Sequence, residues 1–139
     1  MLKEVHEHII GELNQGARTD TIFVITAVLF NLIVLGVNSA VASEASSVGA
    51  DASSDLILVV FILMSLIVNG ISITALFFGR QTRAKLLNGL LAMYRDNDVD
   101  RYYDASLLAN YGKRYLLFTG VILALAATGI AVPLIVRFV

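Results

Sequence analysis

The chain has no cysteine, no tryptophan and a single proline among its 139 residues. Without cysteine there is no disulfide, no thiolate metal site and no thiol nucleophile. Without tryptophan, tyrosine and phenylalanine would have to form any aromatic belt at a membrane surface. Charge is scarce as well, because 15% of the residues are charged and the net charge is −1. This balance gives no reason to expect a nucleic-acid partner.

Apolar residues are abundant instead, at 58% of the chain with a mean hydropathy of +0.80. Soluble domains are typically about 45–50% apolar and roughly 25% charged. A soluble fold of this length could not cover so much apolar surface, whereas a lipid bilayer accepts it. The composition therefore predicts one compact unit embedded in a membrane, with no second domain.

Three segments are long enough to cross a bilayer, which takes about 20 largely apolar residues. They are residues 21–42, 56–79 and 115–136, and none contains Asp, Glu, Lys, Arg or His. The first segment could be read as a secretory signal peptide, because Ala40 and Ala42 offer small residues for cleavage. The residues before it are net acidic, however, whereas a signal peptide begins with a short positive region. We expect a retained span.

The loops on the two sides of the second span differ in charge. Residues 80–114 carry seven Lys and Arg side chains, whereas residues 43–55 carry none and have three acidic residues. Basic loops remain in the cytoplasm. We therefore expect a multi-pass protein of the cell membrane, in which the N-terminus and residues 80–114 are cytoplasmic. Residues 43–55 form an extracytoplasmic loop, and the C-terminus is extracytoplasmic as well.

The cytoplasmic segments have helical periodicity. Residues 1–19 predict an amphipathic helix, with apolar residues at Leu2, Val5, Ile9 and Leu13. Gly16 is expected to end this helix, and Thr19 or Asp20 to cap the first span. Residues 80–114 predict two amphipathic helices joined by a polar turn, a helical hairpin below the membrane. No proline separates the hairpin from either neighbouring span, so its helices can continue into the spans.

The most acidic run lies in the hairpin, where Asp96, Asp98 and Asp100 stand at every second position. A calcium loop of the EF-hand type also needs glycine at its sixth position and a bidentate glutamate at its twelfth. Counted from Asp96, these positions hold Arg101 and Leu107. We therefore interpret the three aspartates as a cytoplasmic turn, with Asp100 capping the following helix. A specific cation site is the weaker alternative.

Polar residues inside the first two spans repeat at helical spacing. Asn31 and Asn38 share one face of the first span, and Ser65, Asn69 and Ser72 form a stripe on the second. Amides in hydrocarbon need hydrogen-bond partners, so both faces should point inward. They either form hydrogen bonds between helices, within one bundle or between subunits, or line a hydrated pore. The first reading is the stronger one.

The third span has a stripe of small residues, which predicts a face for close helix packing. The stripe consists of Gly120, Ala124, Ala127 and Ala131.

Together these features predict an all-α polytopic integral membrane protein with three transmembrane helices, an N-terminal amphipathic helix and a cytoplasmic helical hairpin. The chain lacks charged groups inside the spans and recognisable catalytic or phosphate-binding motifs, so we expect neither catalysis nor a cofactor or metal. The polar faces exceed what three spans can easily satisfy, which predicts a homo-oligomer in the lipid bilayer. An ion or small-solute pore is one function that such an oligomer could have. The alternative is a non-transporting anchor or scaffold subunit that docks a cytoplasmic protein partner.

Overall fold

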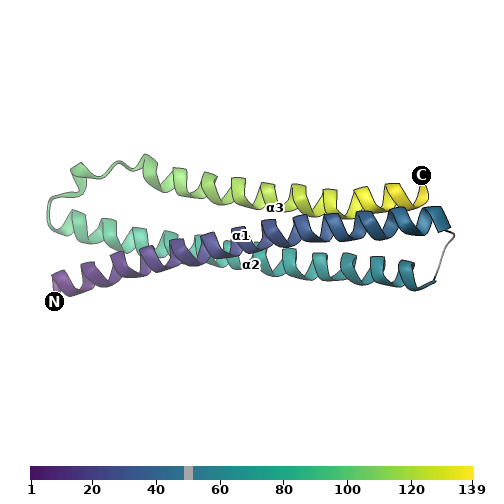
Figure 1. The fold of residues 1–139 in the computed structure, drawn as a ribbon. Helices are drawn as coiled ribbons and strands as arrows, with labels where there is room; N and C mark the ends of the chain where they lie inside the picture. The colour runs from purple at the N-terminus through teal and green to yellow at the C-terminus, as the bar shows by residue number, and fades with distance from the viewer. Residues whose placement is uncertain (49–51) are drawn as a thin grey trace.

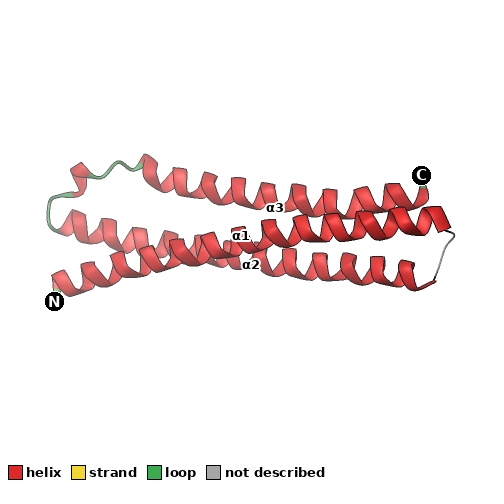
Figure 2. Ribbon diagram, viewed as in Figure 1, coloured by secondary structure: helices red, strands yellow, loops and turns green. Residues whose placement is uncertain are grey.

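The computed structural model describes residues 1–48 and 52–139, and the described chain is helical with no strand (Figure 2). Its elements are α1 (Leu2–Val48), α2 (Ala52–Asp96), the short 3-10 helix η1 (Asp100–Tyr102) and α3 (Ser106–Phe138). The three long helices pack along one another as an elongated bundle (Figure 1). The N-terminus and the turn between α2 and α3 lie at one end of the bundle, and the C-terminus lies at the other.

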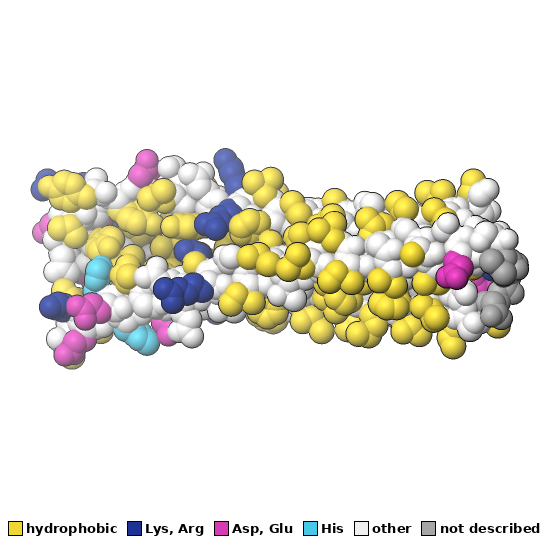
Figure 3. Space-filling view, viewed as in Figure 1, with side chains coloured by type: hydrophobic (Ala, Val, Ile, Leu, Met, Phe, Trp, Pro, Cys, Tyr) yellow, Lys and Arg dark blue, Asp and Glu magenta, His cyan; other side chains and the backbone are white. Residues whose placement is uncertain are grey.

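Each long helix contains a stretch that is long and apolar enough to cross a membrane. The predicted all-helical class and its three apolar helices are therefore confirmed. Figure 3 shows that apolar side chains cover most of the visible surface toward the C-terminal end, whereas most Lys, Arg and His gather toward the N-terminal end. We call residues 1–20 and 80–114 the charged half of the bundle, and the remaining described residues the apolar half.

Helix α1 is longer than the sequence pattern predicts. It passes through Gly16 without a break, and it also includes residues 43–48 of the expected loop. A glycine inside a helix costs only about 1 kcal/mol relative to alanine, which packing against two other helices can outweigh. The Thr19 hydroxyl donates to the carbonyl of Gln15 one turn earlier, so Thr19 lies within the helix and does not cap it. Residues 49–51 of the expected loop lie outside the described residues.

Helices α2 and α3 continue through both boundaries between the halves, as the absence of proline there allowed. Residues 80–96 are the last turns of α2, and residues 106–114 are the first turns of α3. The predicted hairpin is thus built from the ends of two long helices. Its apolar faces cover those of the first turns of α1. The buried cluster there consists of Leu13, Leu87 and Leu90, with Ile9, Ile10, Leu86, Tyr94, Leu108 and Tyr111 packed against it.

Within the single chain, α3 packs through a face other than the predicted stripe. Gly120, Ala124, Ala127 and Ala131 are all exposed on the outside of the bundle. The buried residues of α3 are Tyr115, Ile122, Ala126, Gly129 and Pro133. Small residues occur on more than one side of this helix, so their spacing alone did not distinguish the inner face from the outer one. At the buried Gly129, an added Cβ would lie 3.9 Å from the carbonyl oxygen of Asn31, which shows how closely α3 approaches α1.

Candidate functional site

An amide pair lies in the apolar half between α1 and α2. Asn31 and Asn69 are only 1% and 4% exposed. The Asn31 Nδ2 donates to the Asn69 Oδ1 at 2.7 Å, and the Asn69 Nδ2 donates to the Asn31 Oδ1 at 2.9 Å. Each amide also donates to its own helix, Asn31 to the carbonyl of Ala27 and Asn69 to the carbonyl of Ser65. The two amides therefore satisfy each other within a single chain.

The other three polar side chains predicted for these faces are also buried. The Ser65 hydroxyl lies beside the amide pair and donates to the Asn31 Oδ1 at 3.4 Å. The Ser72 hydroxyl donates to the carbonyl of Val68 in its own helix. Asn38 is fully buried, and its amide has no hydrogen-bond partner among the described residues. A buried amide without hydrogen-bond partners lowers the free energy of unfolding by about 1–3 kcal/mol, so Asn38 destabilises the bundle.

A second buried group lies where the apolar and charged halves meet. The Tyr115 hydroxyl of α3 donates a hydrogen bond to the Asp20 Oδ2 of α1. Both residues are buried, with Asp20 only 8% exposed. On α2, a Cβ added to Gly79 would lie 2.5 Å from the Asp20 Oδ1. The hydrogen bond between α1 and α3 thus lies directly against the backbone of α2, and a side chain at position 79 would displace the Asp20 carboxylate.

Sequence reasoning missed this group and interpreted Asp20 as a possible cap. The sequence nevertheless contained a sign of it, because all three residues lie at the cytoplasmic ends of the predicted spans. Asp20 directly precedes the first uncharged segment, Gly79 ends the second and Tyr115 begins the third. Three antiparallel spans place these three positions at one level of the bundle.

Arg83 lies next to this group, at the border of the charged half. Its guanidinium carbon is 4.4 Å from the centre of the Tyr111 ring, a cation–π contact, and its buried Nε has no acceptor among the described residues. A cavity of about 310 Å³ between α1 and α2 is lined by Arg83 and Asp20. Its remaining wall combines polar residues such as Gln15 with apolar ones such as Phe23. Charged side chains therefore line a cavity at the boundary between the charged and apolar halves.

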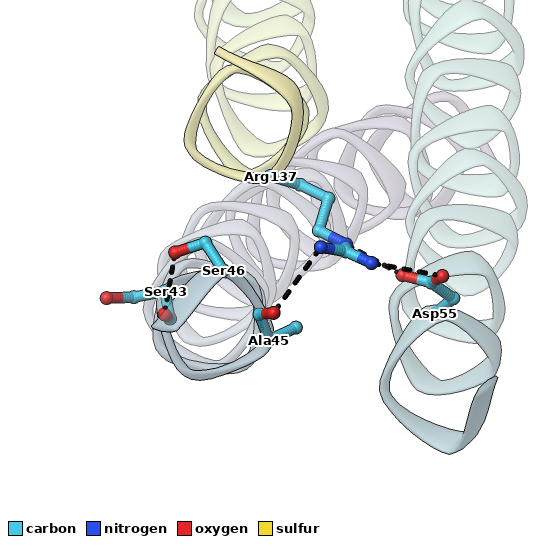
Figure 4. Close-up of polar contacts among 5 residues, drawn as sticks. All are labelled: Ser43, Ala45, Ser46, Asp55 and Arg137. Carbon is cyan, nitrogen blue, oxygen red and sulfur yellow. Dashed lines mark hydrogen bonds and ion pairs between the residues drawn. The ribbon is translucent and has the colours of Figure 1, made fainter. Parts of the chain in front are cut away.

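A third polar group ties the helices together at the opposite end of the bundle (Figure 4). The Arg137 Nε of α3 donates to the Asp55 Oδ1 of α2 at 2.8 Å, and its Nη2 donates to Oδ2 at 3.3 Å. The Nη1 donates to the Ala45 carbonyl of α1 at 3.4 Å. The hydrogen bond from Arg137 holds the pKa of Asp55 below its usual value and raises the pKa of Arg137. Both groups therefore keep their charges at neutral pH.

The three aspartates of the acidic run surround the turn between α2 and α3. Asp96 is the last residue of α2, Asp98 has a left-handed backbone with φ of 57°, and Asp100 begins η1. Asp100 does not cap α3 as predicted, because it is the first residue of η1 and α3 begins only at Ser106. Asp104 takes this role, since its Oδ1 accepts the backbone N–H of Ser106 at 2.9 Å. This hydrogen bond also lowers the pKa of Asp104.

Within residues 1–48 and 52–139, no three His, Asp or Glu side chains are grouped in a way that could hold a metal ion. The side chains of His6 and Tyr94 form a separate polar contact near the N-terminus, with the His6 Nε2 3.2 Å from the Tyr94 hydroxyl. This contact joins the first turns of α1 to the end of α2.

The chain was compared with models of protein families, with curated proteins and with solved structures, and none of the three comparisons finds a match.

Proposed function

We propose that the protein is an integral membrane protein of the cell membrane with three spans, and that it serves as a non-transporting, non-catalytic anchor or scaffold subunit. Exposed apolar side chains along all three helices support the membrane location, among them Leu29, Leu63 and Leu123. The unequal distribution of basic residues supports the orientation, with the charged half in the cytoplasm and the C-terminus outside.

The observation that carries the scaffold function is the closed amide pair of Asn31 and Asn69. A pore needs polar groups directed toward water. These two amides are buried and bond to each other, so one copy of the chain satisfies them, whereas Asn38 is left without a partner among the described residues. The apolar faces of the charged half are covered within the same chain as well.

The charged half is suited to hold a cytoplasmic protein partner at a fixed distance from the membrane. Its three helices continue from the proposed spans without interruption, which makes the projecting part rigid. At the tip, Tyr102 is 77% exposed and Val99 is exposed beside it. Aromatic residues are enriched at protein interfaces, so the turn between α2 and α3 is the proposed docking surface.

A homo-oligomer that forms a pore is the second candidate. The exposed stripe of Gly120, Ala124, Ala127 and Ala131 favours it, because small residues on an outer face allow the helix of a second copy to approach closely. In such an assembly the pore would run between copies, and Asn31 and Asn69 would stay buried inside each of them.

Flux measurements distinguish these candidates. Purified protein is reconstituted in vesicles, and release of an entrapped ion and a small neutral solute is compared with that from protein-free vesicles. We expect the same rates for wild type, for Asn69→Leu and for empty vesicles. The oligomer size is measured in detergent on the same preparations. Wild-type flux above background from an oligomer would overturn the scaffold function, and a strict monomer would exclude the pore.

A further inference from the structure

The basic residues at the border between the two halves form no ion pair with any acidic residue that the structure describes. Among the described residues, ion pairs link the N-terminal amine to Glu4, Lys3 to Glu7 and Arg137 to Asp55. None of these involves a basic residue of the charged half of α2 or α3. Arg80 and Arg83 lie directly after the apolar part of α2, and Lys113 and Arg114 directly before that of α3. This level of the bundle therefore carries a net positive charge, because these four cations outnumber the nearby acidic Asp20.

Two of these cations line a cavity of about 240 Å³ between α2 and α3. Arg80 and Arg83 are three residues apart on α2, and helical residues at that spacing are neighbours. Asn88 and Tyr111 contribute further polar groups, and no acidic residue lines this cavity. On the α3 side, a Cβ added to Gly112 would lie 3.4 Å from the Arg80 Nη2, so the guanidinium of Arg80 lies close to the backbone of α3.

The donors in this cavity fit a phosphate group. A guanidinium offers forked N–H donors that match phosphate oxygens, and it binds them more strongly when other charges do not compete. The Nε of Arg83 is buried and has no acceptor among the described residues. Its stacking on the Tyr111 ring fixes the plane in which the remaining N–H groups point. Arg80 and Arg83 both line the cavity, and neither forms an ion pair with a described residue, so the outer N–H groups of their guanidinium groups can donate to a ligand there.

An apolar groove continues from this cavity toward the apolar half. It has a volume of about 190 Å³ and lies between the same two helices, with Ile73, Leu76, Phe77 and Leu116 in its walls. Arg80 and Tyr115 line both the groove and the cavity. Leu116 is 69% exposed, and Phe77 is exposed as well. A free phosphate ion would use only the cavity, whereas a phospholipid would use both parts.

We propose that the groove between α2 and α3 binds one anionic phospholipid, with its phosphate held by Arg80 and Arg83 and an acyl chain along Ile73, Phe77 and Leu116. This inference rests on the proposed membrane insertion. In that orientation the cavity lies at the level of the headgroups of the cytoplasmic leaflet, where anionic lipids attract basic residues. The lipid lies along two helices that also contact each other directly and through the ion pair of Arg137 and Asp55.

Because the chain has no tryptophan, a single Leu116→Trp reporter makes the site visible. The reporter protein is reconstituted in vesicles that contain brominated phosphatidylglycerol or brominated phosphatidylcholine, and quenching gives the relative affinity of the two lipids. We expect a clear preference for phosphatidylglycerol. Arg80→Gln and Arg83→Gln should each lower the preference for phosphatidylglycerol roughly fivefold, because one basic residue contributes about that factor to binding at an anionic surface. Lys85→Gln, outside the cavity, should leave it unchanged.

A second reporter, Leu29→Trp on the exposed face of α1, is expected to show no preference between the two lipids. Equal quenching of Leu116→Trp by both lipids would overturn the lipid site and leave the membrane insertion intact. Quenching by neither lipid would overturn both. A preference that is abolished by added inorganic phosphate would assign the cavity to a free anion. Arg80 is exposed, so Arg80→Gln tests the site even if Arg83→Gln does not fold.

Discussion

Replacing Asn69 by leucine is expected to destabilise the bundle by about 1–2 kcal/mol. The substitution removes both reciprocal hydrogen bonds to Asn31, whose buried Oδ1 would keep only the longer contact with Ser65. The loss is expected to be moderate because the Asn31 Nδ2 still donates to the carbonyl of Ala27. Reversible unfolding in mixed micelles, followed by circular dichroism, measures this change.

Asn38→Leu is the matched control for this experiment. Asn38 is the same residue type and is likewise buried, but it lies on α1 and its amide has no partner among the described residues. Removing this amide abolishes a desolvation cost and should stabilise the protein by about 1 kcal/mol. The double variant Asn31→Leu/Asn69→Leu should lose less than the sum of the two single losses, since no unpaired amide remains. A larger loss for Asn38→Leu than for Asn69→Leu would contradict the assignment of the pair.

Tyr115→Phe is expected to cost about 1.5–3 kcal/mol, the range for hydrogen bonds to charged groups. The variant keeps the ring in the core between Ala27, Leu76 and Ile122, and it removes only the hydroxyl that donates to Asp20. The Asp20 carboxylate then stays buried without this donor. Melting temperatures of the purified variants in detergent provide the measurement.

Tyr111→Phe serves as the control for Tyr115→Phe. The Tyr111 hydroxyl makes no hydrogen bond within the described residues, and a phenylalanine ring retains the cation–π contact with Arg83. We expect little change in its melting temperature. Equal effects of the two substitutions would show that the bond between Asp20 and Tyr115 does not hold α1 and α3 together.

Periodicity in the sequence predicted which polar residues face inward, but it did not show how they pair. Asn31 and Asn69 each share a helix face with other polar residues, and both faces are buried. Which amides meet depends on the register between α1 and α2, which arises from the packing of whole helices. Asn38 lies on the same helix face as Asn31, yet its amide has no hydrogen-bond partner among the described residues.

The helix boundaries and the face of α3 were harder to predict for physical reasons. Gly16 is a weak helix breaker by itself, and packing of the first turns of α1 on α2 outweighs its local preference. Helix α3 is apolar on both its outer and its inner side, so no difference in polarity between the two sides identifies Ile122 and Gly129 as buried. The bonds from Asp20 to Tyr115 and from Asp55 to Arg137 join residues 95 and 82 positions apart, beyond the range of any local pattern.

Cysteine labelling tests the proposed three-span arrangement most directly, because the natural chain contains no cysteine. Single cysteines are introduced at Ser47 and Tyr102, which are both exposed and lie at opposite ends of the bundle. A maleimide that cannot cross membranes is then applied to cells that express each variant. We predict that Ser47→Cys is labelled in intact cells and that Tyr102→Cys is labelled only after the membrane is permeabilised. Labelling of Tyr102→Cys in intact cells would contradict the proposed arrangement.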